Sequence, residues 1–214
     1  MLIFDLDGTL IDSAGDLHRS VNVLLAEHSL EPLSLPAVRK MIGDGVSQLV
    51  TRAFAARSVE VADLSKEVRR YLEIYAESPV GLTQTYEGVA ETLDTLTARG
   101  VAMTICTNKP ERISLEILER LDLLKHFKAV VGGDTNPFRK PDPRMLTQLL
   151  DRFAADRDSS YLIGDSEVDA EAAEAANVRF VLMTYGYRRG PVEQMRRHLA
   201  LNRFADLITL VTAL

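Results

Sequence analysis

Two aspartates stand close together near the start of the chain, in the segment Asp5-Leu6-Asp7-Gly8-Thr9. Carboxylates can bind a hard cation, carry a proton or attack an electrophilic centre. The segment directly follows the apolar run 2–4, which is typical of a buried strand, and Gly8 would let the backbone approach a ligand closely. An acidic turn that caps the next element also explains these residues. Other segments must decide between the two interpretations.

Three further segments place polar side chains after apolar runs or in a stiffened turn. Thr107-Asn108-Lys109 offers a hydroxyl and turn amides, although it could also be only a helix N-cap. Lys140-Pro141 offers a cation held by proline, although a single lysine is often a solvated surface charge. Gly164-Asp165 and Asp169 bring two more carboxylates, where a charged strand-to-helix turn is the plainer alternative. Each segment alone is weak evidence for a functional site. The presence of all four segments, in this order along the chain, favours one shared site.

The elements expected to position these residues alternate along the chain. Apolar runs occupy residues 2–4, 101–106, 129–131, 161–163 and 179–184, and stretches with helical spacing separate them. Alternating strands and helices predict an α/β fold, with a Rossmann-like parallel sheet core and helices on both faces. The carboxyl ends of such strands share one crevice, so the side chains that follow them should meet there.

Residues 13–82 interrupt this alternation. Apolar side chains recur at helical spacing from Leu17, from Val46 and from Leu64, which predicts three or four amphipathic helices and no strand. The breaks expected between them lie at Glu31-Pro32, Leu35-Pro36 and Gly43-Asp44-Gly45. We therefore predict an all-helical cap domain over 13–82, inserted into an α/β core domain made of 1–12 and 83–214.

Composition excludes several classes of protein. Of the 214 residues, 46% are hydrophobic and 26% are charged, which is typical of a globular chain and excludes a disordered or disulfide-scaffold protein. The formal net charge is -6, so the chain lacks the basic field that attracts nucleic acid. No apolar run reaches the roughly 18 residues that cross a bilayer, and the N-terminus shows no export signal. With only one cysteine, Cys106, we expect a cytoplasmic protein that binds neither membrane nor nucleic acid.

Together the four segments resemble the motifs of the haloacid dehalogenase superfamily of phosphohydrolases. The matching residues are Asp5-x-Asp7-Gly8-Thr9, Thr107, Lys140 and Gly164-Asp165-x-x-x-Asp169, in that order. The resemblance extends over essentially the whole chain, and the helical insert is similar to the C1-type cap of that superfamily. The segments most similar to its bacterial phosphoglycolate phosphatase branch are Thr107-Asn108-Lys109-Pro110, Gly132-Gly133-Asp134, Lys140-Pro141 and Thr184-Tyr185-Gly186-Tyr187.

The resemblance implies an enzyme that hydrolyses a small phosphorylated metabolite, with 2-phosphoglycolate as the expected substrate, through an aspartyl-phosphate. Mg²⁺ is the implied cofactor, held by the carboxylates of Asp5 and Asp165 and by the backbone carbonyl of Asp7. Asp5 is then the nucleophile, and Asp7 is the acid and base. We expect burial and nearby anions to favour the neutral form of Asp7.

The remaining motif residues receive binding and supporting roles. The residues expected at the phosphate, besides Asp5, are Gly8, Thr107, Asn108 and Lys140. Asp169 is expected to orient Lys140 or a water on the metal, and Thr9 to support the first motif. An ordinary acid in the first turn of a helix also explains Asp169.

Other functions remain open from the sequence. A phosphoglucomutase-like phosphoryl transferase, a pyrophosphatase or another sugar-phosphate phosphatase would share the nucleophile. A dehalogenase fits less well, because members with that activity lack the second acid of the first motif, here Asp7. A non-enzymatic phospho-receiver also combines an acidic Mg²⁺ pocket with Thr and Lys, but it needs no helical lid. Either a monomer or a homodimer fits the sequence.

Overall fold

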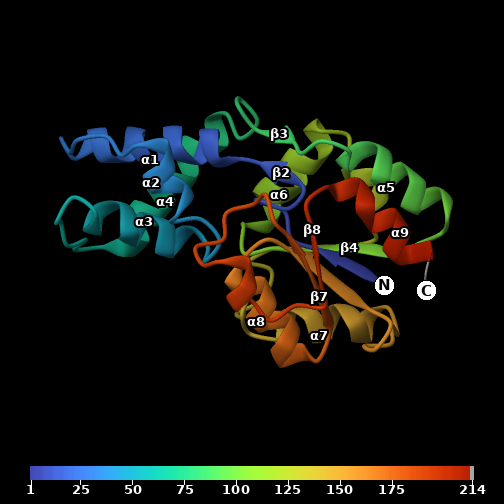
Figure 1. Cartoon of the computed structure of the whole chain (residues 1–214). Coiled ribbons are helices and arrows are strands. Elements are labelled where there is room, and N and C mark those ends of the chain that lie inside the picture. The colour runs from blue at the N-terminus through green and yellow to red at the C-terminus, as the bar shows by residue number, and fades with distance from the viewer. Residues whose placement is uncertain (213–214) are drawn as a thin grey trace.

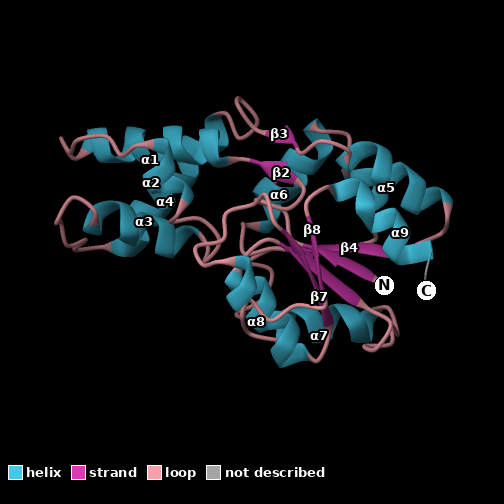
Figure 2. Ribbon diagram, in the orientation of Figure 1, coloured by secondary structure: helices cyan, strands magenta, loops and turns pink. Residues whose placement is uncertain are grey.

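A parallel sheet of six strands forms the centre of the computed structural model, which describes residues 1–212 (Figure 1 and Figure 2). The strand order is β5-β4-β1-β6-β7-β8. In chain order these strands are β1 (Leu2–Phe4), β4 (Met103–Cys106), β5 (Val130–Val131), β6 (Tyr161–Gly164), β7 (Arg179–Met183) and β8 (Leu199–Leu201). The predicted α/β core with a parallel sheet is confirmed.

Helices cover both faces of this sheet (Figure 2). Successive strand side chains point to opposite faces, so Leu2 and Phe4 pack into one hydrophobic cluster and Ile3 into the other. The helices on the first face are α5 (Val89–Ala98), α6 (Glu111–Arg120) and α9 (Leu207–Thr212). Those on the second face are α7 (Arg144–Arg152) and α8 (Glu167–Ala176). Within residues 1–212, no helix has the length and apolar character that a membrane span requires.

The helices within residues 14–77 form a separate lobe beside the sheet (Figure 1). They are α1 (Ala14–Glu27), α2 (Leu35–Arg39), α3 (Val46–Ala55) and α4 (Leu64–Glu77). The chain enters the lobe through β2 (Ile11–Asp12) and leaves it through β3 (Gln84–Thr85), and these short strands pair antiparallel with each other. The chain therefore enters and leaves the lobe side by side. The division into a cap domain over 13–82 and a core domain stays a prediction.

Some predicted element boundaries are wrong. Leu35-Pro36 does not break a helix, because α2 begins there with proline in its first turn, where the missing N–H costs no hydrogen bond. The strands β2, β3 and β8 were not predicted, since two or three residues are too few to show an alternating pattern. The predicted run 101–106 begins as a strand only at Met103, and the run 179–184 ends at Met183.

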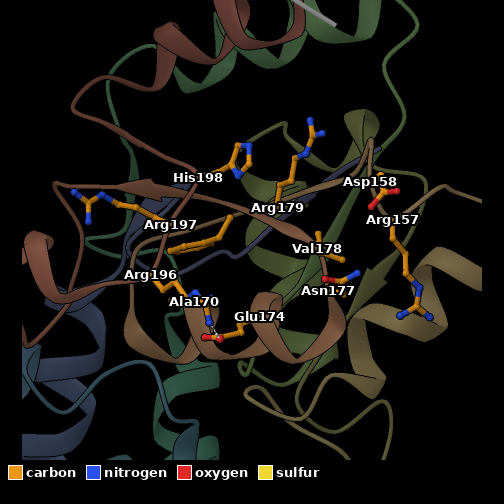
Figure 3. A pocket seen from close by; sticks show the side chains of 11 residues that line it. Arg157, Asp158, Ala170, Glu174, Asn177, Val178, Arg179, Arg196, Arg197 and His198 are labelled. Carbon is orange, nitrogen blue, oxygen red and sulfur yellow. Dashed lines mark hydrogen bonds and ion pairs between the residues drawn. The ribbon is translucent and has the colours of Figure 1, made fainter.

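A cavity of about 500 Å³ lies at the amino end of β7, where Arg179 begins that strand (Figure 3). Its lining is rich in arginine, but these side chains bind acceptors of the chain itself. Arg196 pairs with Glu174, and Arg157 donates to the carbonyl of Ala176. None of the residues predicted for the site lines this cavity, so the chemistry must be sought at the carboxyl ends of the strands.

Candidate active site

Three neighbouring strands end at the predicted motifs. Asp5 follows β1, Thr107 follows β4 and Asp165 follows β6, and these strands lie in the order β4-β1-β6. Phe4, the last residue of β1, pairs with Ile105 of β4 and Ile163 of β6, each one residue before the end of its strand, so the three segments leave the sheet close together. The parallel sheet thus brings three distant parts of the sequence into one crevice.

Lys140 lies between two buried carboxylates. Its Nζ is 2.9 Å from Oδ1 of Asp5 and 2.6 Å from Oδ1 of Asp169, and all three side chains are buried. Burial opposes the charged form of Lys140, but Asp169 and Asp5 outweigh it and raise its pKa. The lysine therefore carries a fixed positive charge beside Asp5, where a transferring phosphoryl group would need it.

Asp169 holds Lys140 in place and also caps a helix. Its Oδ1 accepts from Lys140, while its Oδ2 accepts from the Ser166 hydroxyl at 2.6 Å and the Ser166 N–H at 3.1 Å. The bond from the Ser166 N–H is one half of a capping box at the start of α8, and in the other half the Ser166 side chain accepts from the Asp169 N–H. Asp169 is therefore an acid in the first turn of a helix and also a partner of Lys140. Its hydrogen bonds to Ser166 hold the carboxylate in the position from which it contacts the lysine.

Asp165 sits in a cradle made largely of backbone. Its Oδ1 accepts from the Thr9 hydroxyl at 3.1 Å, and its Oδ2 accepts from the Tyr187 N–H at 2.5 Å. A Cβ on Gly8, whose φ is +86°, or on Gly186 would collide with this carboxylate. Gly8 was expected to let the backbone approach a phosphate. In the structure its missing side chain lets the backbone approach Asp165, and its contact with phosphate stays a prediction.

A hard divalent cation fits the acids at this position. Carboxylate oxygens of Asp5, Asp165 and Asp169 lie within 4.8 Å of one another, and the group contains neither His nor Cys. Oδ1 of Asp5 is buried and makes no hydrogen bond, although the Lys140 ammonium lies nearby. An all-oxygen donor set suits Mg²⁺. The Asp7 carboxylate lies outside this group, and coordination through its backbone carbonyl stays a prediction.

Mutual repulsion and burial disfavour the charged forms of these acids. Burial raises the pKa of Asp5 to about 6, with Lys140 opposing and Asp169 adding to the effect. Burial, Asp169 and Asp5 together raise the pKa of Asp165 well above its usual range. A bound divalent cation would compensate both carboxylates, which explains why the chain tolerates them so close together.

Asp7 faces a lysine that sequence analysis assigned no role. Nζ of Lys109 lies 3.0 Å and 2.9 Å from the two carboxylate oxygens of Asp7, and the Ser13 hydroxyl donates to Oδ1 at 2.6 Å. The expectation that nearby anions act on Asp7 is therefore incomplete, because a cation, the Lys109 ammonium, contacts its carboxylate directly. Lys109 directly follows Thr107-Asn108, but nothing in that segment indicates a partner 102 positions away.

Thr107 and Asn108 bind protein groups around the crevice. The buried Thr107 hydroxyl accepts from the Lys109 N–H at 3.3 Å. The Asn108 side chain donates to the carbonyls of Gly43 at 3.1 Å and Lys140 at 2.9 Å, and accepts from the Lys140 N–H at 2.9 Å. Asn108 thereby joins the helical lobe to the Lys140 loop. Contacts of Thr107 and Asn108 with a phosphate stay predictions.

The helical lobe closes a small cavity over Asp5 and Asp7, of about 40 Å³. Lys109 and Thr107 line its polar end. The other side chains that line it include Leu17, Ile42, Val46, Leu49, Tyr71 and Tyr75. A group bound to Asp5 would therefore extend into a confined space that is mostly apolar.

Two residues to which sequence analysis assigned no role, Asp16 and Tyr187, fix the connections to the lobe. The buried Asp16 carboxylate accepts from the N–H groups of Leu82 and Thr83, each at 2.8 Å. The Tyr187 hydroxyl accepts from the Ser13 N–H at 2.8 Å and donates to Asp12 at 2.7 Å. Both pairs are distant in sequence, so no local pattern could reveal them. The two connections to the lobe, at 12–13 and 81–83, are thus tied to neighbouring elements.

The free energy of unfolding of the metal-free protein should contain a contribution from Asp5 that falls as the pH rises. Unfolded Asp5 ionises near pH 4, whereas in the folded protein its pKa is about 6. The stabilisation is therefore complete below about pH 4 and is lost as the pH rises through about 6, amounting to on the order of 2–3 kcal/mol. Mg²⁺ should offset this loss because it favours the ionised acids. Urea unfolding at about pH 4 and about pH 7.5, with Mg²⁺ or with chelator, measures the effect.

The Asp5→Asn variant is the control for this measurement. Asn does not titrate, so the part of the pH dependence that comes from Asp5 should be missing. If the variant kept the full pH dependence of the parent, the titration would belong to other groups.

Comparisons with known proteins agree with the geometry. The family model described as "Haloacid dehalogenase-like hydrolase" matches residues 2–183. The chain belongs to this hydrolase family. The relatives include the phosphoglycolate phosphatase of Rhodospirillum rubrum, which is 42% identical over 212 residues, with 96% of this chain and 88% of that protein covered. Phosphoglycolate phosphatase 1 of Pseudomonas aeruginosa is 38% identical over 214 residues, with 97% and 78% covered.

Solved structures of the haloacid dehalogenase-like hydrolases share this fold. The crystal structure of a predicted phosphoglycolate phosphatase from Haemophilus somnus superposes with a TM-score of 0.94 at 30% identity, with 99% of this chain and 97% of that chain covered. A family hydrolase from Geobacter sulfurreducens gives a TM-score of 0.76 at 25% identity, with coverages of 98% and 97%. The predicted resemblance is confirmed, and with its named phosphatase relatives this family member is a phosphoric monoester hydrolase.

Proposed function

We propose that this hydrolase is a Mg²⁺-dependent phosphatase of 2-phosphoglycolate that acts through an aspartyl-phosphate on Asp5. The observation that carries the proposal is the buried contact between Asp5 and Lys140, at 2.9 Å, beside Asp165. A carboxylate next to a fixed cation and further acids can act as a nucleophile toward a phosphate dianion. The names of the relatives support glycolate as the leaving group.

Each side chain then has a distinct part in the reaction. Asp5 and Asp165 would hold Mg²⁺, which neutralises phosphate charge and aligns the ester when it is bound. An oxygen of Asp5 forms a bond to phosphorus while the ester oxygen leaves, and Lys140 and Thr107 bind the transferring phosphoryl oxygens. Water then attacks the aspartyl-phosphate, which returns the Asp5 carboxylate and releases phosphate.

Asp7 is placed to move the protons. The departing alkoxide takes a proton from Asp7 in the first half-reaction, and Asp7 takes one from the attacking water in the second. Ser13 and Lys109 fix the position of its carboxylate. An anionic substrate that draws the Lys109 ammonium away from Asp7 would free this acid to take up the proton that it later donates.

Replacement of Asp7 with Asn should slow both half-reactions, by about 10²- to 10⁴-fold each. Rapid-quench assays that follow formation and decay of the phosphoenzyme measure the two rates separately. Ser13→Ala is the comparison variant, because it removes one of the hydrogen bonds that position Asp7 but keeps the acid itself, so both rates should fall much less than in Asp7→Asn. Parent rates for both steps in Asp7→Asn would move the acid and base role to another group.

The proposed function is tested with a panel of phosphate esters. We expect the highest kcat/KM with 2-phosphoglycolate when it is compared with sugar phosphates, nucleotides and pyrophosphate. Excess chelator should stop phosphate release, and added Mg²⁺ should restore it. A clear preference for a sugar phosphate would refute the substrate, isomerised product without phosphate release would indicate a phosphoryl transferase, and full activity in chelator would refute the metal dependence.

A further inference from the structure

Helix α4 presents two tyrosines to the cavity above Asp5 and Asp7. Tyr71 and Tyr75 are separated by one helical turn and therefore lie on the same face of the helix. Their side chains are 0% and 1% exposed, and their rings are stacked with centroids 6.1 Å apart. Both tyrosines line the cavity together with Asp7 and Lys109. The lobe thus contributes two phenols to the space next to the reacting groups.

Neither phenol hydroxyl has a hydrogen-bond partner in the described structure. A buried polar group without a partner costs about 1–3 kcal/mol, and phenylalanine would fill the same volume without that cost. The Tyr71 and Tyr75 hydroxyls would therefore be stabilised by a hydrogen-bond acceptor, which the described part of the protein does not supply. A ligand in the cavity can supply it, because both side chains line the space that such a ligand would fill.

The surroundings of the two hydroxyls favour a compact anion. Burial raises the pKa of both phenols well above the usual range, so both groups keep their protons and can donate. Nζ of Lys109 lies 4.7 Å from the centre of the Tyr75 ring, and an anion in the cavity would compete with Asp7 for this ammonium. The apolar side chains of Leu17 and Leu49 on the cavity wall suit a short hydrocarbon stem. A carboxylate on one methylene satisfies all three features.

We propose that the Tyr71 and Tyr75 hydroxyls form a subsite that donates hydrogen bonds to the carboxylate of the leaving group. The subsite selects esters of small hydroxy acids over esters of neutral alcohols, because a carboxylate offers one oxygen to each phenol and its charge strengthens both hydrogen bonds. This inference rests on the proposed function, since it assigns the residues that recognise the glycolate part of the substrate.

A pair of substrates of similar shape tests the subsite. 2-Phosphoglycolate and ethyl phosphate differ in the carboxylate that the tyrosines would bind, so the ratio of their kcat/KM values reports on that group alone. In Tyr71→Phe, in Tyr75→Phe and most strongly in the double variant, this ratio should fall by about 10- to 100-fold. Phe keeps the ring packing, and urea midpoints equal to or above that of the parent would show that the variants fold.

Tyr86→Phe is the matched control. The Tyr86 hydroxyl is also buried without a hydrogen-bond partner, but Tyr86 lines a different cavity, so its removal should leave the ratio unchanged. A parent enzyme that hydrolyses both esters equally well would contradict the proposed function, and this inference with it. A parent that prefers 2-phosphoglycolate, and a double variant that keeps this preference or loses both activities equally, would overturn the subsite alone.

Discussion

Asp5→Asn should abolish steady-state phosphate release while the protein still folds. Asn has nearly the same shape, but its amide is a poor nucleophile toward phosphorus, so no aspartyl-phosphate can form. Loss of a nucleophile costs about 10³-fold or more in kcat, because the other groups act only together with it. Phosphate release from 2-phosphoglycolate and acid-stable labelling of the protein with radioactive phosphate measure the two aspects of this loss.

The fold should survive this substitution because Lys140 keeps a second acid. Its Nζ still pairs with Asp169 at 2.6 Å, so the ammonium is not left alone in the core. Asp151→Asn is the control, since Asp151 is an exposed acid on α7 and should have no effect on turnover. Steady-state hydrolysis by purified Asp5→Asn at a rate near that of the parent would assign the nucleophile to another residue.

The sequence was sufficient to predict the sheet and the residues that gather at its edge. Short apolar runs separated by helical stretches specify a parallel sheet, and the acids that follow those runs must then lie at one end of it. Asp5 and Asp165 belong to segments of this kind, which is why their proximity followed from local pattern and topology. The helical spacing within residues 13–82 likewise indicated the helices of the lobe.

Contacts between distant loops could not be predicted in the same way. Lys109 pairs with Asp7 and Tyr187 with Asp12 across 102 and 175 positions, and each pairing depends on how two loops pack. The role of Gly8 was missed for a similar reason. A glycine after a strand indicates a close approach of the backbone, but the sequence does not say whether the neighbour is a ligand or, as here, the Asp165 carboxylate.

The tyrosine hydroxyls without a hydrogen-bond partner show a related limit of prediction from sequence. Helical spacing places Tyr71 and Tyr75 on the buried face of α4, where large side chains are expected to fill the core. Only the structure shows that both residues line a cavity and that their buried hydroxyls meet no acceptor. Periodicity thus identifies a buried face, whereas the function of a polar atom on that face depends on the elements packed against it.

Lys140→Met should destabilise the protein strongly as well as reduce its activity. The side chain lies between two buried carboxylates, and removing it leaves Asp5 and Asp169 as uncompensated charges in the core. Breaking a buried ion pair in this way costs about 3–5 kcal/mol. The phosphoryl oxygens would also lose a fixed positive charge, which should lower kcat by about 10²- to 10³-fold. Urea unfolding and phosphate release measure the two effects.

Lys125→Met is the matched control on stability. Lys125 also pairs with an aspartate, Asp122 at 2.5 Å, but both side chains are exposed to solvent. Water solvates both charges of such a pair, so its loss should leave the urea midpoint nearly unchanged. Equal midpoints for the two variants would show that Lys140 contributes no more to stability than an exposed lysine and would contradict the predicted cost of leaving the two acids without a cation.

The loss of unfolding free energy in Lys140→Met should become smaller when the buried acids lose their charge. Lys140 opposes the rise in the pKa of Asp5, so without the lysine this pKa should lie above the value of about 6 in the parent. Lowering the pH therefore neutralises Asp5 in the variant and relieves the repulsion from Asp169 and Asp165. Adding Mg²⁺ at neutral pH should relieve it as well, because the cation takes over part of the compensation. A deficit that is independent of both pH and Mg²⁺ would instead mean that Lys140 stabilises the fold through packing of its hydrocarbon stem.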